Sequence, residues 1–77
     1  MNEAEAMVAI VKELQRATDK HHHWPDDKIH AVAIMAEEPG EAVRAVLDHG
    51  YAGKSIEEVK KELIHTGAMA IRCLLNM

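Results

Sequence analysis

Aromatic residues are almost absent from this chain of 77 residues, which contains no phenylalanine, one tryptophan and one tyrosine. Hydrophobic residues nevertheless make up 48% of the chain, mainly as alanine, valine, isoleucine, leucine and five methionines. This composition suits helix-on-helix packing, and neither strand alternation nor an internal repeat is visible. The sequence therefore predicts an all-α fold, in one domain that covers residues 1–77.

Three further scarcities restrict the class of protein. Cys73 is the only cysteine, so an internal disulfide is excluded, and its apolar neighbours predict a buried thiol. No apolar run approaches the roughly 20 residues of a membrane span, and the first ten residues lack the basic start of a signal peptide. The net charge of −4 argues against binding to nucleic-acid polymers. We therefore expect a cytoplasmic protein without membrane or nucleic-acid polymer partners.

The short length bears on assembly. A chain of 77 residues buries only about 60% of the surface that it exposes when unfolded, so a lone core of this size is marginal. We expect a three-helix unit that assembles into a helical bundle as a homo-oligomer, either a homodimer or a homotetramer.

Capping residues and apolar spacing predict three helices, over about residues 3–19, 25–49 and 55–75. Asn2 and Glu5 are expected to cap the first helix reciprocally, and Ser55 and Glu58 the third. On the third helix the predicted apolar stripe consists of Ile56, Val59, Leu63, Gly67, Ala70, Ile71 and Leu74.

The second helix has its own start, stop and interruption signals. Pro25 fits its first turn, with Asp26 and Asp27 favourable at the positive end of the helix. Gly50 fits its C-terminal stop. Pro39 lies in the middle, where a proline removes one hydrogen bond and clashes with the preceding turn. A kink or local break is therefore predicted near residue 39.

Two pairs of potential metal ligands occur at helical spacing. Glu38 and Glu41 are three residues apart on the second helix, and Glu62 and His65 are three apart on the third. Two antiparallel helices with such pairs can hold a divalent cation between them, and carboxylate oxygens suit magnesium or manganese. The alternative is ordinary solvated surface, because helical-wheel geometry places both pairs roughly opposite the apolar stripes of their helices.

The surroundings of these pairs resemble a known family. The segment Glu37-Glu38-Pro39-Gly40-Glu41, within the stretch from Trp24 to Val43, resembles the signature helix of MazG-type, all-α nucleoside triphosphate pyrophosphohydrolases. That signature is E-x-x-E, followed on the next helix by E-x-x-D, and Glu62 matches the first residue of its second half. Residues 68–72 also resemble the small, apolar continuation of that helix. The resemblance covers about residues 24–75, roughly two thirds of the chain.

The resemblance implies a fold, a reaction and a cofactor. The fold would be a bundle built from two or more copies, with Mg²⁺ held by Glu38, Glu41, Glu62 and the fourth position, His65. The reaction would convert a nucleoside triphosphate into a monophosphate and pyrophosphate, as nucleotide-pool house-cleaning, with Glu38, Glu41 and Glu62 as the catalytic carboxylates. The metal would neutralise phosphate charge and orient a water molecule for attack.

The fourth position departs from the family pattern, because His65 stands where the signature has an acid. Imidazole nitrogen suits manganese, zinc or nickel better than magnesium. Three interpretations stay open: an altered metal preference, with Mn²⁺ in place of Mg²⁺; a histidine that does not touch the metal; or a degenerate site. The last would make the chain a non-catalytic MazG-like module for oligomerisation or for metal or nucleotide binding. A further alternative is a protein that binds metal through its histidines without turnover.

Other residues are candidates for substrate contacts. Trp24 suits stacking on a nucleobase, although a single tryptophan beside a helix start is more often a core anchor. Lys20, Lys54 and Arg72 are candidates for phosphate contacts, but no motif assigns that role. The run from His21 to His23 is interpreted first as a polar linker and second as a donor to metal or phosphate.

Overall fold

The computed structural model describes all 77 residues, Met1–Met77, as three helices without strands. Helix α1 covers Glu3–Lys20, α2 covers Lys28–Ala52 and α3 covers Ile56–Leu75. The predicted all-α class is therefore confirmed. None of the three helices combines the length and the apolar character needed to cross a membrane.

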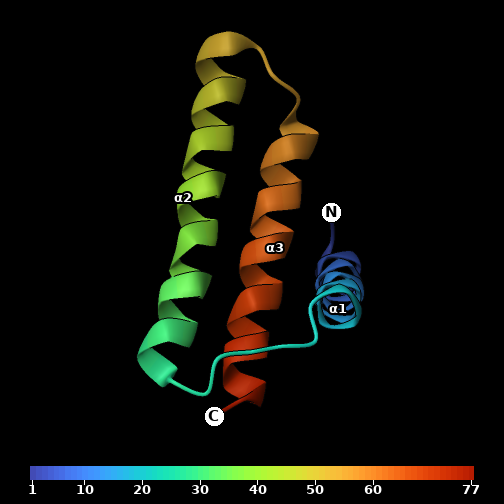
Figure 1. Cartoon of the computed structure of the whole chain (residues 1–77). Helices are drawn as coiled ribbons and strands as arrows, with labels where there is room; N and C mark the ends of the chain where they lie inside the picture. Colours follow the sequence, from blue (N-terminus) through green and yellow to red (C-terminus); the bar gives the residue numbers. More distant parts are fainter.

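Helix α3 lies between the other two helices. Figure 1 shows α2 and α3 side by side and antiparallel, whereas α1 is seen end-on beside α3. The contacts agree, because α3 packs against both α1 and α2 and these two do not pack against each other. The fold is thus an α-hairpin with a third helix laid across one of its members.

The start of α1 matches its predicted cap. The Asn2 side chain accepts a hydrogen bond from the Glu5 backbone N–H at 2.8 Å, and the Asn2 backbone N–H donates to the Glu5 carboxylate at 3.1 Å. Two of the four unpaired N–H groups at a helix start are satisfied in this way.

Both predicted ends of α2 are wrong by about one turn. The helix begins at Lys28, because Asp27 is its N-cap and accepts a hydrogen bond from the Ile29 backbone N–H at 3.0 Å. It continues past Gly50 and ends at Ala52, and the next residue, Gly53, is its C-cap and adopts a left-handed conformation with φ of 67°. Gly53 is the only residue with positive φ, so it supplies the stop that Gly50 does not.

Helix α2 also runs through Pro39, so the predicted local break is wrong, while a kink near residue 39 stays a prediction. The ribbon is continuous along its length in Figure 1. Ala31 and Ala42, on either side of the proline, are both buried, and α3 is the only helix on which α2 packs. Packing on both sides of Pro39 thus holds the helix together despite the lost hydrogen bond.

The predicted features of α3 hold only in part. Ser55 caps the helix by accepting from the Glu57 backbone N–H at 3.1 Å, but Glu58 does not complete a capping box and lies 3.8 Å from Lys61 instead. Of the predicted stripe only Val59 is buried, whereas Leu63 and Leu74 are 55% and 73% exposed. Because two helices pack on α3 from different directions, its buried side chains are not confined to one stripe: Val59, Ala68, Arg72 and Cys73.

Arg72 joins α3 to the linker that follows α1. Its guanidinium donates to the Ala17 carbonyl at 3.4 Å and to the His21 carbonyl, and it lies 4.7 Å from the centre of the Trp24 ring. The side chain is buried. Cys73 beside it is buried as predicted, with its thiol 3.6 Å from the Ala31 carbonyl.

Close packing of α1 on α3 depends on Gly67. A Cβ atom at this position would lie 2.9 Å from Cδ1 and 3.2 Å from Cγ1 of Ile10, on α1. We expect Gly67→Ala to lower the free energy of unfolding by about 1–2 kcal/mol, because overpacking outweighs the gain in helix propensity.

The matched control is Gly40→Ala on α2, where a Cβ atom would meet nothing within 4 Å. This change should stabilise the protein by about 0.5–1 kcal/mol. Urea unfolding monitored by circular dichroism measures both variants. Equal stabilisation by the two substitutions would contradict the close packing at Gly67.

Candidate metal centre

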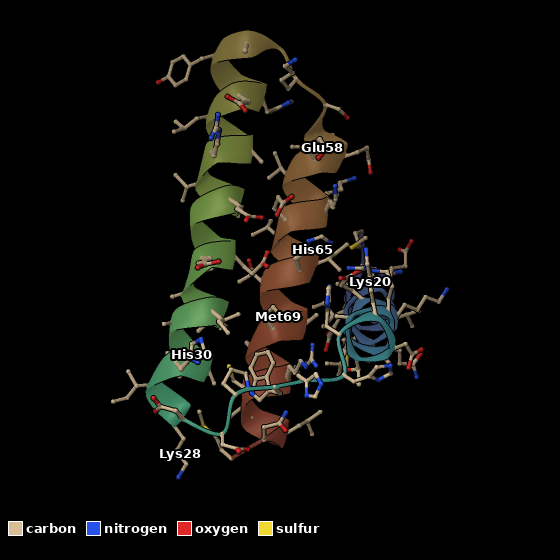
Figure 2. All side chains as sticks on the ribbon, viewed as in Figure 1. Lys20, Lys28, His30, Glu58, His65 and Met69 are labelled. Carbon is tan, nitrogen blue, oxygen red and sulfur yellow. The ribbon has the colours of Figure 1, made fainter.

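Three of the predicted metal ligands converge between α2 and α3. Glu38, Glu62 and His65 each offer one ligand atom, and these atoms all lie within 4.8 Å of one another. Figure 2 places His65 near the middle of α3, one turn before Met69. The i, i+3 spacing of Glu62 and His65 directs both side chains to one side of α3, toward Glu38 on α2. We refer to these three residues as the Glu–Glu–His cluster.

The cluster is not on open surface, which the helical-wheel argument had left as an alternative. The side chains of Glu38, Glu62 and His65 are only 23%, 15% and 23% exposed. For Glu62 and His65 the wheel failed because it treats α3 as having a single partner, whereas α1 packs on α3 from another direction and covers a strip outside the predicted stripe. Glu38 lies on α2, which packs on α3 alone, and it faces the other two side chains across that contact.

One nitrogen of His65 faces two carboxylates. Its Nδ1 atom lies 4.0 Å from Glu38 Oε2 and 3.9 Å from Glu62 Oε2. Both of these oxygens are buried without a hydrogen-bond partner. A buried acceptor without a partner costs about 1–3 kcal/mol, and more when it is charged. The two oxygens and the nitrogen therefore fit a divalent cation, which would satisfy all three atoms at once.

Burial changes the proton affinity of both carboxylates. Loss of solvent raises the pKa of Glu38, and the charge of the nearby Glu41 raises it further, while His65 opposes the change. Burial likewise raises the pKa of Glu62, followed in importance by hydrogen bonding and charge repulsion with Glu41, again opposed by His65. A cation bound among these groups would relieve both the desolvation and the repulsion.

A fourth carboxylate, Glu13 on α1, approaches the cluster and was not predicted from the sequence. Its Oε2 atom lies 3.5 Å from His65 Nε2. Arg16 holds the same carboxylate through two hydrogen bonds, of 2.7 and 2.6 Å. In the sequence Glu13 and Arg16 form an ordinary i, i+3 ion pair, and nothing in such a pair indicates a neighbour on α3.

A groove of about 270 Å³ opens beside the cluster. Glu38 and His65 are among the residues that line it, and Trp24 and Met69 contribute apolar surface. The Trp24 ring is half-buried and carries Arg72 over one face. Three histidines line the groove: His65 and, from the predicted linker run, His21 and His23. The groove thus combines an aromatic ring, acids, arginines and histidines within one small volume.

A second cavity, of about 310 Å³, lies along the same pair of helices toward their connecting loop. Glu41 and Glu62 line it together with Arg44 and Lys54. Four of its lining residues are acidic and two are basic. Its charge is therefore unfavourable for a polyphosphate unless cations enter with it.

The remaining predicted site residues lie in different places: in the second cavity, in the groove or on the exposed surface. Glu41 approaches Glu62 but is not one of the three converging ligands. Lys54 lines the second cavity, together with Arg44, which the sequence did not single out. Arg72 lines the groove, yet its guanidinium already donates to two backbone carbonyls. Lys20 is exposed at the end of α1.

The chain matches no protein-family model, no curated protein and no solved structure. The likeness to the MazG-type family therefore rests on the motif residues of the sequence alone.

The raised pKa values set the pH dependence of stability. For a carboxyl group with a folded pKa above its ordinary value of 4.5, the native state binds more protons than the unfolded state over the interval between the two values. We therefore expect these two carboxyl groups to make the metal-free protein less stable as the pH rises above about 4.5. Glu13 acts oppositely, because hydrogen bonding to Arg16 lowers its pKa and its contribution is lost on acidification.

Replacing Glu62 by Gln removes one of these buried charges. In the presence of a chelator, Glu62→Gln should raise the midpoint of thermal unfolding at pH 7 and reduce its change between pH 5 and pH 7. Asp19→Asn, an exposed change on α1, is the control and should follow the wild type. A wild-type midpoint that rises steadily over this interval would contradict the assigned pKa shifts.

Proposed function

We propose that this protein is a divalent-metal-dependent nucleoside triphosphate pyrophosphohydrolase, which releases a nucleoside monophosphate and pyrophosphate in the cytoplasm as nucleotide-pool house-cleaning. The observation that carries the proposal is the pair of unpartnered buried oxygens, on Glu38 and Glu62, that face His65 Nδ1. A chain with few buried residues gains nothing in stability from two such carboxylates. A bound cation would neutralise their charge and coordinate the two oxygens that lack hydrogen-bond partners.

The Glu–Glu–His cluster would hold the cation, either Mn²⁺ or Mg²⁺, and its nitrogen donor favours Mn²⁺. When bound, such a cation neutralises phosphate charge and lowers the pKa of a water ligand. Glu41, which lies beside Glu62, would accept a proton from the attacking water. The carboxylates thus divide between binding the cation and moving a proton.

The two cavities would divide the substrate. Trp24, in the groove beside Glu38 and His65, suits the nucleoside, because an aromatic ring and an apolar side chain accommodate a base. The departing pyrophosphate would occupy the second cavity, where Arg44 and Lys54 supply two positive charges against four acidic residues, so it would enter together with a cation. Glu38 and His65 line the groove and Glu62 lines the second cavity, so the cluster lies between them, where the bond to the α-phosphate would break.

We further propose that the chain functions as a homodimer. It exposes 5616 Å², whereas a folded monomer of 8.6 kDa exposes about 4,700 Å². The excess, about 900 Å², is close to the roughly 800 Å² that each partner contributes to a standard interface. An apolar groove along α2 and α3 supplies a suitable surface, lined by Pro39, Ala42, Val43, Val46, Val59, Leu63 and Thr66.

Pyrophosphate release tests the activity. We expect turnover of at least one member of a panel of ribo- and deoxyribonucleoside triphosphates, with Mn²⁺ more effective than Mg²⁺. Glu41→Gln should lower kcat by about 10²–10⁴-fold, as loss of a general base does. Glu57→Gln, an exposed change on α3 that is paired only with Lys60, is the control. If neither metal supports pyrophosphate release at high protein concentration, the proposed enzymatic activity is contradicted. The alternative of a non-catalytic module then remains.

Light scattering on a size-exclusion column tests the assembly. The wild type should have the mass of two chains, and Leu63→Gln, within the apolar groove, should shift it toward one chain. Ile29→Gln, an equally polar change at an exposed position outside the groove, should leave the mass unchanged. A monomeric wild type at micromolar concentration would refute the dimer.

A further inference from the structure

The two nitrogens of His65 face different groups. Nδ1 is turned toward the unpartnered oxygens of Glu38 and Glu62, at 4.0 and 3.9 Å. Nε2 is turned toward Glu13, at 3.5 Å. The ring therefore stands between a potential cation position and a carboxylate that belongs to another helix.

Glu13 is held firmly at the far side of this ring. Its carboxylate forms two parallel hydrogen bonds with Arg16, the geometry that gives the strongest carboxylate pairs. The side chain is only 12% exposed. Hydrogen bonding to Arg16 also lowers the pKa of Glu13, so the group is ionised and accepts hydrogen bonds throughout the neutral range.

We propose that Glu13 is a positioning residue for His65, and that it turns this histidine into a nitrogen ligand of the cation. Its carboxylate accepts a hydrogen bond from the Nε2–H group, which leaves the lone pair on Nδ1 free for a cation between this nitrogen and the oxygens of Glu38 and Glu62. Closing the distance from 3.5 Å to a charge-assisted hydrogen bond of about 2.8 Å takes a shift of under about 1 Å. The inference rests on the proposed function only in requiring that the cluster binds a cation.

A positioning role for Glu13 favours one of the alternatives that the sequence left open for His65, namely a histidine that binds the cation. Metal-binding histidines generally donate their second ring N–H to a carboxylate or carbonyl, which fixes the ring and makes the ligand more basic. With Glu13 in that role, His65 contacts the cation and replaces an acid without leaving the site degenerate. The same nitrogen ligand shifts selectivity from Mg²⁺ toward Mn²⁺.

A double-mutant cycle tests the role of Glu13. Calorimetry would measure Mn²⁺ and Mg²⁺ affinity for the full chain as wild type, Glu13→Gln, His65→Asp and the combination of both. Glu13→Gln should lower Mn²⁺ affinity by about 10–100-fold, the usual effect of losing such an orienting group, and should lower Mg²⁺ affinity less. In the His65→Asp background the same change should cause no loss, because no ring is left to orient.

The outcomes separate this inference from the proposed function. Normal Mn²⁺ binding that is insensitive to Glu13→Gln would overturn the positioning role and leave the metal centre intact. An equal loss in both backgrounds would also overturn it, because Glu13 would then act on the fold or touch the cation directly. A wild type that binds neither cation would refute both proposals. Asp19→Asn should keep wild-type affinity, and circular dichroism should show equal helix content in all variants.

Discussion

The contact of Arg72 with the linker determines where α1 lies and, through α1, the surroundings of the cluster. The guanidinium is buried without a carboxylate partner, and two backbone carbonyls and the face of Trp24 offset its desolvation. Since α1 packs on α3 alone, this contact fixes the far end of α1 against the hairpin. Gly67 allows the close approach nearer its middle, and Glu13 reaches His65 as a result.

The small core of this domain supplies little stability, whereas the buried carboxylates of the cluster reduce it. Seven residues are buried and none of them is both large and fully enclosed. Domains of ordinary stability are held by only about 5–15 kcal/mol, so two buried oxygens without partners are a considerable burden. The proposed cation would coordinate the oxygens of Glu38 and Glu62 that lack hydrogen-bond partners. The proposed second copy of the chain would cover apolar surface that a monomer exposes to water.

The sequence predicted the elements better than their contacts. Local signals sufficed for the three helices and for the cap at Asn2, because capping depends on residues within one turn. The end of α2 was misplaced because Gly50 and Gly53 look alike in sequence and only the path of the loop selects one. Glu38, Glu62 and His65 were found through motif spacing. Glu13 was not, because its role comes from a tertiary contact between α1 and α3 that helical periodicity does not encode.

The position of α1 has a consequence for access to the cluster. Glu13 and Arg16 line the groove beside Glu38 and His65, yet the helix that carries them contacts only α3. A helix with a single neighbour can detach while the α2–α3 hairpin stays folded, as a local opening of low free energy. Undocking of α1 would widen the groove that its residues Glu13 and Arg16 line, so a ligand could enter without the movement of a loop. A ligand that contacts α1 would bind more tightly when α1 is docked, and its binding would in turn stabilise the docked position of α1 to the same extent.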